Sequence, residues 1–271
     1  MSFRRLARVA LDETFIGGAL GRVPFVESLY KRSALYRHHR GHFYGVYESF
    51  EKAQADIPAE RPAGWDNKES AKIWLNDIAP IMPGTYPLLL WLSLLLRDGS
   101  VLVDYGGSIG LTYYGFQRFR PLPANVRWVI IEVPKIVEAG RRVAEERGAA
   151  LEFVTSTSEA PAADILVTAG AIQYMRDSVP GLLDRFATKP KHVIINKVPL
   201  TSKPAFWTLQ NFGTGISPYR IYNEAEFLGY FIQNGYVIRD RWDVHELSCS
   251  IKFHPNNCVP FFSGIYFEKC G

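Results

Sequence analysis

The sequence is poor in cysteine and lacks a long apolar run. Its three cysteines, at positions 249, 258 and 270, cannot all pair within one chain, so we expect no disulfide framework and a reducing, cytoplasmic location. The longest uncharged apolar run, residues 86–96, is shorter than the about 20 residues that cross a bilayer, and we expect it to form a buried helix. Acidic residues interrupt the N-terminal stretch where a signal peptide needs its apolar core, which argues against export.

Low-complexity tracts and fixed-period repeats are also missing, and an apolar content of 47% in 271 residues is typical of one globular body. Positive charge is unevenly spread, because residues 1–45 hold eight Lys or Arg against three Asp or Glu. That segment has a net charge of +5, which leaves −1 of the total +4 for the rest of the chain. It is either a solvated face or an anion-binding surface, and it contains no recognisable nucleic-acid-reading module.

Strand and helix patterns alternate from residue 100 onward, whereas residues 1–97 carry helical patterns and no clear strand. Short runs rich in Val and Ile, bounded by turn residues, predict buried parallel strands joined by crossover helices. These runs are VLVDYG (101–106), WVIIEV (128–133), LEFVT (151–155), ADILVTAG (163–170) and HVIINKV (192–198).

Two of the helices have clear ends in the sequence. One is predicted to begin at Pro134, a residue suited to a first helical turn, and to end at Gly148. The other begins after Asn223, which forms a capping box with Glu226, and ends near Gly235. The segments GYVIRDRWDV and FFSGIYFEK then predict two closing strands, which are antiparallel because the loop between them is too short for a helical crossover.

An acidic residue and a glycine-rich turn follow the first predicted strand, in VLVDYGGSIGLTYYGF. Gly106, Gly107 and Gly110 permit a tight turn and a close approach of the backbone to a ligand, and the helix N-terminus that follows favours an anionic group. The dinucleotide fingerprint G-x-G-x-x-G is not met, because counting from Gly106 its second and third glycines are Ser108 and Leu111. The turn therefore does not predict an NAD site.

Glu132 ends the next strand, 28 residues after Asp104 (132 − 104). A carboxylate at this place can accept hydrogen bonds from both hydroxyls of a ribose. The alternative is an ordinary acidic residue at an exposed strand end. We expect its side chain to be exposed at this end of the strand, so that its removal would leave no cavity in the core.

The motif around Asp104, Gly106 and Gly110 resembles the first motif of class I S-adenosylmethionine-dependent methyltransferases, with Ser108 in place of the middle glycine. IIEVPKIVEAG resembles the ribose-binding stretch of small-molecule O-methyltransferases in the same class. The resemblance implies an α/β fold with a Rossmann-like, doubly wound, mostly parallel sheet and an antiparallel last strand in residues 98–271, preceded by a helical extension or lid in residues 1–97. It also implies S-adenosylmethionine as the cofactor, held by residues Asp104, Gly106, Gly107, Ser108, Gly110, Glu132, Val133, Thr155, Ser156, Ala169, Gly170 and Gln173.

The acceptor is less well defined by the sequence. NKVPLTSKPAFWTLQNFGTGISPYRIYNEAEF and FSGIYFEK resemble a little-studied bacterial methyltransferase group linked with surface-polysaccharide loci, which implies a small-molecule or glycan acceptor methylated at a hydroxyl. Two loop histidines are candidate bases, two polar residues of a glycine-rich loop are candidate acceptor contacts, and we expect no metal. These candidate catalytic residues are His245, His254, Asn211 and Arg220.

The sequence leaves open two alternative functions and one hypothesis about the N-terminal segment. One alternative is a module that binds the cofactor without turnover, and the other is an NAD-dependent sugar-modifying enzyme. The basic, aromatic-rich N-terminal segment is a candidate lid over an anionic or sugar-bearing acceptor, with Arg37, Arg40 and Tyr44 in contact with it and His38, His39, His42 and Phe43 nearby.

Overall fold

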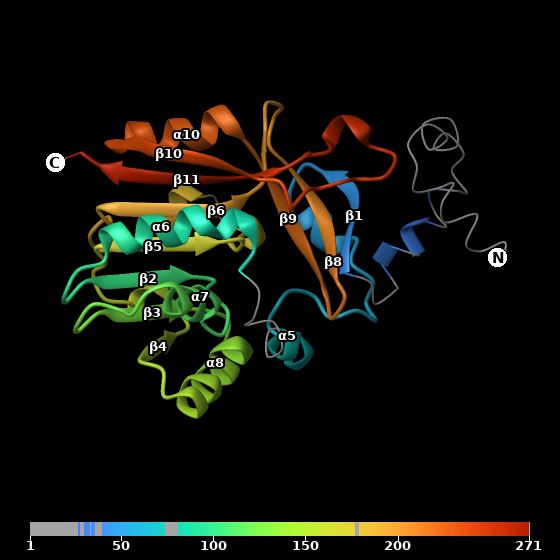
Figure 1. Cartoon of the computed structure of the whole chain (residues 1–271). Helices are drawn as coiled ribbons and strands as arrows, with labels where there is room; N and C mark the ends of the chain where they lie inside the picture. The colour runs from blue at the N-terminus through green and yellow to red at the C-terminus, as the bar shows by residue number, and fades with distance from the viewer. Residues whose placement is uncertain are drawn as a thin grey trace.

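The computed structural model describes residues 27, 30–32, 34, 35, 40–73, 81–176 and 179–270. Within these segments the chain forms two β-sheets with helices packed around them (Figure 1). None of the described helices combines the length and the apolar character that crossing a bilayer requires.

The larger sheet has seven strands in the order β10-β11-β6-β5-β2-β3-β4. Five neighbouring strands are parallel, while β11 pairs antiparallel with both β6 and β10. This arrangement confirms the predicted Rossmann-like sheet and its antiparallel closing strands. The strands are β2 (Val101–Tyr105), β3 (Arg127–Ile131), β4 (Leu151–Val154), β5 (Ile165–Ala169), β6 (His192–Val198), β10 (Tyr236–Val244) and β11 (Phe262–Lys269).

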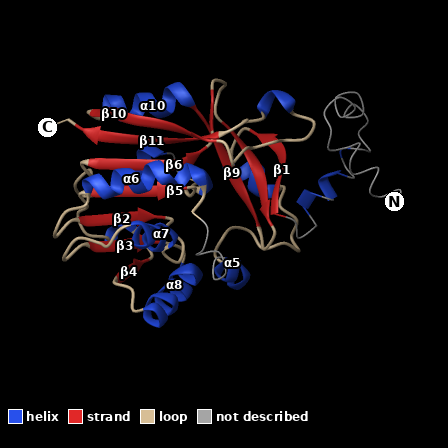
Figure 2. Cartoon of the chain, in the orientation of Figure 1, coloured by secondary structure: helices blue, strands red, loops and turns tan. Residues whose placement is uncertain are grey.

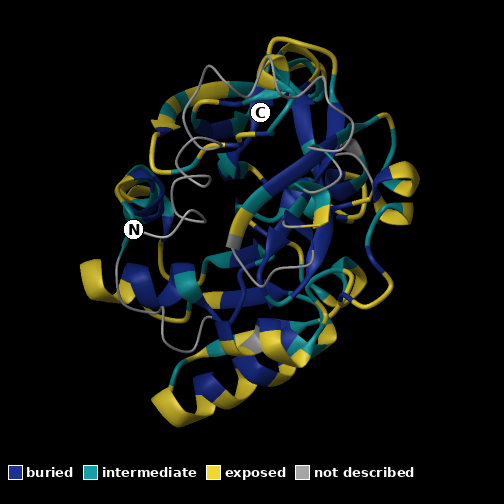
Figure 3. Ribbon diagram, turned by 90° about the vertical axis from the view of Figure 1, so that its right-hand side faces the viewer, coloured by how far each residue is buried: buried dark blue, intermediate teal, exposed yellow. Residues whose placement is uncertain are grey.

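Helices cover both faces of this sheet, which makes it doubly wound (Figure 2). Apolar side chains of α6, α7 and α8 pack on one face, and those of α9 and α10 pack on the other. Figure 3 shows buried strands between helices whose outer faces are exposed. The helices are α6 (Tyr86–Leu95), α7 (Leu111–Phe119), α8 (Pro134–Arg147), α9 (Val179–Leu183) and α10 (Glu224–Gln233).

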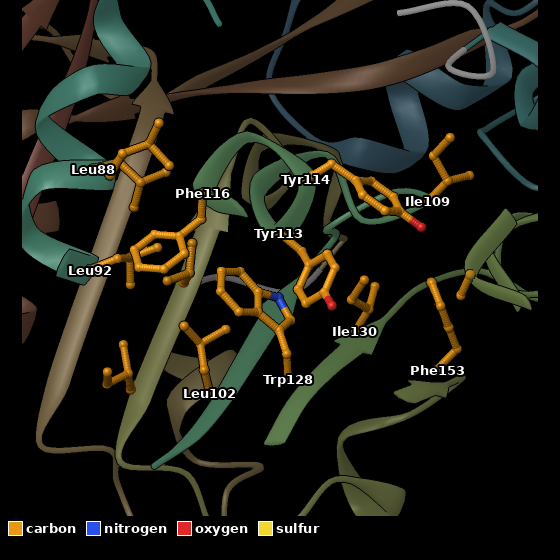
Figure 4. Close-up of a cluster of buried hydrophobic side chains, with 14 of the residues drawn as sticks. Leu88, Leu92, Leu102, Ile109, Tyr113, Tyr114, Phe116, Trp128, Ile130 and Phe153 are labelled. Atoms are coloured by element: carbon orange, nitrogen blue, oxygen red, sulfur yellow. The ribbon is translucent and has the colours of Figure 1, made fainter. Parts of the chain in front are cut away.

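Trp128 on β3 lies at the centre of the core under α6 and α7 (Figure 4). Its side chain is fully buried and makes an edge contact with the ring of Tyr113, with 5.5 Å between ring centroids. The ring centroid of Phe116, on the same face of α7 as Tyr113, lies 6.2 Å from that of Trp128. Aromatic contacts of this kind add to the free energy gained by burying the rings, and they fix α7 and hence the glycine turn that precedes it.

The helix ends lie where the sequence places them. Pro134 is the first residue of α8, and Gly148 ends it with a left-handed φ of 59°. The Asn223 side chain accepts a hydrogen bond from the backbone N–H of Glu226 at 2.9 Å, which caps α10. Caps are local signals, so they can be found from the sequence without knowledge of the tertiary fold.

A second sheet was not expected. It has four strands in the order β1-β8-β9-β7, and β1 comes from the N-terminal region, so the expectation of no strand before residue 100 is wrong. The expected boundary at residue 97 does not divide the packing either, because α6 packs against the larger sheet while β1 pairs with β8. The strands are β1 (Arg40–Tyr47), β7 (Leu200–Thr201), β8 (Phe206–Phe212) and β9 (Ile216–Asn223).

The second sheet stands beyond the carboxyl ends of the parallel strands (Figure 1). The segment NFGTGISPYR, expected as a glycine-rich loop, is the hairpin that joins β8 to β9, with Gly213 at a φ of 91° in its turn. Short helices connect these parts: α4 (Phe50–Ala55), α5 (Lys68–Ile73), η1 (Pro83–Thr85), η2 (Thr157–Glu159), η3 (Ile172–Tyr174) and η4 (Pro255–Asn257).

Candidate active site

A cavity of about 860 Å³ lies between the carboxyl edge of the larger sheet and the second sheet. The edge is at the point where the strand order reverses, since β2 pairs with β3 on one side and with β5 on the other. Ligands of open α/β sheets bind at such a point, and the volume is in the range of small-molecule pockets. The predicted cofactor residues that line the cavity are Gly106, Gly107, Ser108, Glu132, Val133, Thr155, Ala169, Gly170 and Gln173.

The turn after β2 depends on its small residues. Gly106 has a φ of 69°, and a Cβ added there would lie 2.1 Å from the Cβ of Ala171. A Cβ on Gly107 would lie 2.6 Å from Cγ of Asp104. Gly110 has a φ of 103° and forms the N-cap of α7, without lining the cavity. Glycine is required here both for conformation and for space.

Ser108 adopts a φ of 56°, in the left-handed region. This conformation explains why the methyltransferase motif that the turn resembles has glycine at the position of Ser108. A left-handed conformation costs a non-glycine residue about 1–2 kcal/mol. Serine is tolerated with this strain because it is small and its backbone N–H donates to Oε1 of Glu132 at 3.1 Å.

We expect Ser108→Gly to raise the free energy of unfolding by about 1 kcal/mol, since glycine adopts this conformation without strain. Urea denaturation of the two proteins measures the change. Asn125→Gly is the matched control, because Asn125 has the same φ of 56° in a loop away from the cavity. A destabilised Ser108→Gly protein would mean that the serine hydroxyl contributes more than the backbone strain costs.

Asp104 lies beneath the turn and is fully buried, so it supports the loop and does not line the cavity. Burial raises the pKa of its carboxyl to about 7, while the nearby Thr112 hydroxyl and Trp128 indole act in the opposite direction. Its carboxyl group occupies the space next to Gly107. The predicted role of Asp104 is therefore best described as holding the turn that lines the cavity.

Glu132 follows β3 and joins it to the turn. Its Oε1 accepts from Ser108 N–H, and its Oε2 accepts from the backbone N–H of Val133 at 2.9 Å. The side chain is half-buried in the cavity wall, so the expectation of an exposed strand-end residue is wrong. Burial raises its pKa to about 7, against the lowering effect of these two backbone donors. A carboxyl group fixed in this way can accept further hydrogen bonds from a ligand hydroxyl.

The edges of β4 and β5 complete this half of the cavity. Thr155 lines the cavity, whereas Ser156 does not, and the hydroxyls of both donate to Oε1 of Glu159 at 2.8 and 2.9 Å. After β5, Gly170 has a φ of 84°. Gln173 is buried, and its Oε1 has no hydrogen-bond partner in the described part of the chain.

The opposite half of the cavity is aromatic. The rings of Trp65 and Phe212 are stacked at 3.9 Å, and Tyr174 meets Trp65 edge-on at 5.5 Å and Tyr219 at 5.1 Å. The Tyr174 hydroxyl donates to Oε1 of Gln210 on β8. Tyr174 directly follows the predicted cofactor residue Gln173 in the sequence. The other four residues could not be found from the sequence, because the pairing of distant segments brings them together.

Lys197 was also missed, although it lines the cavity at the end of β6. The sequence carried a signal for it, since Asn196 and Lys197 form a polar pair inside the apolar run HVIINKV. At the carboxyl edge of a parallel strand such a pair favours a functional role over a structural one.

The two candidate histidines do not line the cavity. His245 is exposed and lies beside the ring of Phe261, with Nε2 3.8 Å from Oδ2 of Asp243. His254 precedes η4, where its carbonyl accepts from the Asn257 N–H. In this structure neither histidine is placed to act as a base on a ligand in the cavity.

Asn211 and Arg220 are structural residues of the second sheet, which corrects their assignment as acceptor contacts. The Asn211 amide donates to the Ala34 carbonyl at 2.6 Å and accepts from Gly213 N–H at 2.9 Å, so it closes the β8–β9 turn. The Arg220 guanidinium lies over the rings of Trp207 and Tyr222, at 5.5 and 5.1 Å. Neither residue lines the cavity.

The N-terminal lid hypothesis falls only partly on the described residues. Arg37, His38 and His39 lie outside them, and of Arg40 only the backbone position in β1 is described. Tyr44 is buried, 6.5 Å from the ring of Tyr30, and does not line the cavity. His42 and Phe43 do not line it either, but Gly41 on the same strand does.

No protein-family model matches the chain, and no curated protein sequence matches it significantly. Its structural neighbours include S-adenosylmethionine-dependent methyltransferases. Magnesium protoporphyrin IX methyltransferase from Synechocystis, solved with bound SAM, is 14% identical, with a TM-score of 0.46 over 69% of this chain and 78% of that one. A methyltransferase from Clostridium acetobutylicum is 10% identical, with a TM-score of 0.47 over 75% and 98% of the two chains. Likenesses this remote do not assign an activity, so a function has to be inferred from the site itself.

Proposed function

We propose that the protein is an S-adenosylmethionine-dependent methyltransferase that acts on a hydroxyl of a small-molecule or glycan acceptor. The observation that carries this proposal is the link between the glycine turn and Glu132, in which the backbone N–H of Ser108 donates to Oε1 of Glu132 at 3.1 Å. Both residues line one side of the cavity, and its opposite side is aromatic. The turn and Glu132 would hold the cofactor. The aromatic half would hold the acceptor.

Unpaired polar atoms support a ligand of this kind at the turn. The Ser108 hydroxyl and Oε1 of Gln173 are buried and have no hydrogen-bond partner in the described part of the chain. Both residues line the cavity. Buried polar atoms are normally paired, so a ligand that supplies hydroxyl, amine or carboxylate groups at these places satisfies them.

The charge of the cavity favours S-adenosylmethionine over NAD. Among the described lining residues there is no arginine, and Lys197 is the sole lysine, at the β6 edge. NAD carries two phosphates, whereas S-adenosylmethionine carries none and has a positive sulfonium. A wall with Glu132 and few cations suits the second molecule better.

Catalysis in such a site consists mainly of positioning. When bound, S-adenosylmethionine supplies a methyl group on a sulfonium, and transfer to an oxygen is an in-line displacement. The aromatic wall around Trp65 and Phe212 orients the acceptor and excludes water from it. Glu132 would hold the cofactor through its ribose and so keep it in one position relative to the acceptor.

The N-terminal segment contributes to the acceptor half under the same proposal. Gly41 lines the cavity from β1, which pairs with β8, the strand that carries Gln210 and Phe212. This placement supports the proposal that β1 forms part of the wall of the acceptor site. The contacts of Arg37 and Arg40 with the acceptor belong to the same proposal. A role in surface-polysaccharide synthesis in the cytoplasm, suggested by the sequence resemblance, fits a glycan hydroxyl as the acceptor.

We expect S-adenosylhomocysteine to bind with a saturable heat in calorimetry and to raise the melting temperature, because a ligand selective for the folded state stabilises it. At a concentration 100 times the dissociation constant, the gain is about 2.7 kcal/mol. NAD is the matched control ligand and should produce neither effect. Saturable binding of NAD with no heat from S-adenosylhomocysteine would refute the proposed function.

A further inference from the structure

A β-bulge at the end of β6 aims Lys197 into the cavity. In the pairing of β6 with β11, Ile195 faces Ile265 and Val198 faces Ser263, so Asn196 and Lys197 together face the single residue between those partners. Lys197 takes the extra position with a φ of 62°, in the left-handed region that lysine rarely adopts. Bulges of this kind redirect a side chain, and they occur next to active sites.

Asn196 locks the bulge in place. Its Oδ1 accepts from the backbone N–H of Lys197 at 3.0 Å and from Nε1 of Trp242 at 3.1 Å, while its Nδ2 donates to the carbonyl of Gly84 at 3.0 Å. A buried side chain with all these contacts holds the lysine backbone in a conformation that it would not adopt alone.

The lysine side chain lines the cavity beside Gly170, in the predicted cofactor half. A Cβ built on Gly170 would lie 3.7 Å from both Cβ and Cδ of Lys197, and also 3.7 Å from Nε2 of Gln173. Gln173 adjoins Tyr174, which belongs to the aromatic wall. In the described part of the chain no hydrogen bond or ion pair engages the Lys197 ammonium group.

The charged and titratable groups around Lys197 are few. Burial lowers its pKa, and the carboxylate of Glu246 opposes that effect. Tyr174 and Tyr219 line the same cavity, and burial raises the pKa of each hydroxyl above its ordinary value, so both stay neutral. Glu132 lines the cavity directly after β3, on the side of the glycine turn.

We propose that Lys197 is the general base of the reaction and that its amine takes the proton of a phenolic hydroxyl on a planar acceptor held by the aromatic wall. The inference rests on the proposed function and adds the acceptor class to it. The acceptor oxygen forms a bond to the methyl carbon, and the sulfur–carbon bond of S-adenosylmethionine breaks with its electron pair going to sulfur. The phenolic proton ends on the lysine nitrogen, which leaves an aryl methyl ether, S-adenosylhomocysteine and a protonated Lys197.

A phenol suits this base better than a sugar hydroxyl. The ordinary pKa of a phenol is about 10 and that of a lysine about 10.4, so the proton passes between groups of similar basicity, and a lowered lysine pKa increases the share of free amine. Trp65 and Phe212 line this half of the cavity and are stacked on each other, so they supply flat aromatic surface to it. Offset stacking on such a wall holds a phenol ring in the required plane.

The first experiment measures transfer of a radiolabelled methyl group from S-adenosylmethionine at pH 8 to simple phenols, and to benzyl alcohol as the matched aliphatic hydroxyl. We expect transfer to the phenols, with Lys197→Met and Lys197→Arg lowering kcat about 100-fold or more while the affinity for S-adenosylhomocysteine is unchanged. Lys191→Met, in which an exposed lysine just before the other end of β6 is replaced, should behave as the parent.

The second arm replaces the phenol by 4-nitrophenol, which is largely ionised at pH 8 and needs no base. There the loss in Lys197→Met should shrink to a few-fold. A parent protein that binds S-adenosylhomocysteine but methylates no phenol, or a loss that is equally large with 4-nitrophenol, overturns the proposal. Absence of S-adenosylhomocysteine binding refutes instead the proposed function on which it rests.

A measurement without turnover completes the test. Labelling with 2,4-dinitrofluorobenzene, followed by peptide mass spectrometry, compares the reactivity of Lys197 with that of Lys191 as the pH rises. We expect Lys197 to become reactive at lower pH than Lys191, because the free amine is the reactive form. A Lys197 that reacts only at higher pH than Lys191 is not the base.

Discussion

Replacing Glu132 by alanine is expected to weaken the binding of S-adenosylhomocysteine by about 1.5–3 kcal/mol, the range for hydrogen bonds to a charged group, or roughly 10-fold to 150-fold in the dissociation constant. The carboxyl group is held by the backbone N–H groups of Ser108 and Val133, with its remaining acceptor capacity facing the cavity. Isothermal titration calorimetry measures the loss. Glu145→Ala is the matched control, because Glu145 is exposed on α8 and does not line the cavity.

The pH dependence of the affinity for S-adenosylhomocysteine tests whether the charged carboxylate of Glu132 contacts the ligand. Burial raises the pKa of Glu132 to about 7 in the ligand-free protein, so its carboxylate form, the better acceptor for a ribose, increases between pH 6 and pH 8. The affinity of the parent for S-adenosylhomocysteine should therefore rise over this interval, whereas that of Glu132→Gln should stay flat. Equal affinity of parent and alanine variant at pH 8 would show that the ribose is held elsewhere.

The same raised pKa has a defined effect on stability. A carboxyl group whose pKa is higher in the folded than in the unfolded state stabilises the fold fully below the unfolded value, and this contribution is lost as the pH rises through the folded value. For Glu132 that interval runs from the ordinary value of 4.5 to about 7. Near pH 7 the ligand-free site therefore holds both forms of Glu132, and binding of a ribose to the carboxylate would release a proton from the protonated share.

Gly106→Ala is expected to lower the free energy of unfolding by about 2–5 kcal/mol. About 1–2 kcal/mol of this comes from the left-handed φ of 69°, and about 1–3 kcal/mol comes from overpacking, because the new methyl group would lie 2.1 Å from the Cβ of Ala171. The turn and the segment after β5 would be forced apart at the floor of the cavity. Urea denaturation measures the stability, and calorimetry should show S-adenosylhomocysteine binding lost with it.

Gly99→Ala isolates the conformational part of that cost. Gly99 has a similar φ of 76° in the turn before β2, but a Cβ placed there meets nothing within 4 Å. It should lose only about 1–2 kcal/mol and keep its affinity for S-adenosylhomocysteine. If the two alanine variants were equally stable, the contact between Gly106 and Ala171 would not be tight.

The larger sheet could be predicted from the sequence because its signals are local. Apolar runs, Pro134 at a helix start and Gly148 at a helix end each act within a few residues, and the structure confirms them. The glycine turn and Glu132 could be found for the same reason. Each lies directly after a strand, and the carboxyl ends of parallel strands meet at one edge.

The acceptor half could not be predicted, because its residues meet only through long-range pairing. β1 pairs with β8, and the Thr208 hydroxyl donates to the carbonyl of Tyr44 across 164 residues of sequence. Asn211 and Arg220 were assigned to a loop because glycines dominate the local pattern, although those glycines form the turn of a hairpin. Lys197 reaches the cavity through a bulge, which changes the side-chain alternation that a strand pattern assumes.

The pairing of β1 with β8 also sets the order in which the protein is completed during translation. The turn after β2 and the strands β3 to β5 leave the ribosome before β8 exists, so the cofactor half can assemble first. At about 5–20 residues per second, the 164 residues that separate the partners correspond to roughly 8–33 seconds during which β1 lacks its partner strand β8. Unpaired strand edges favour association with other chains. We therefore expect the nascent N-terminal segment to depend on chaperones until the β8–β9 hairpin emerges.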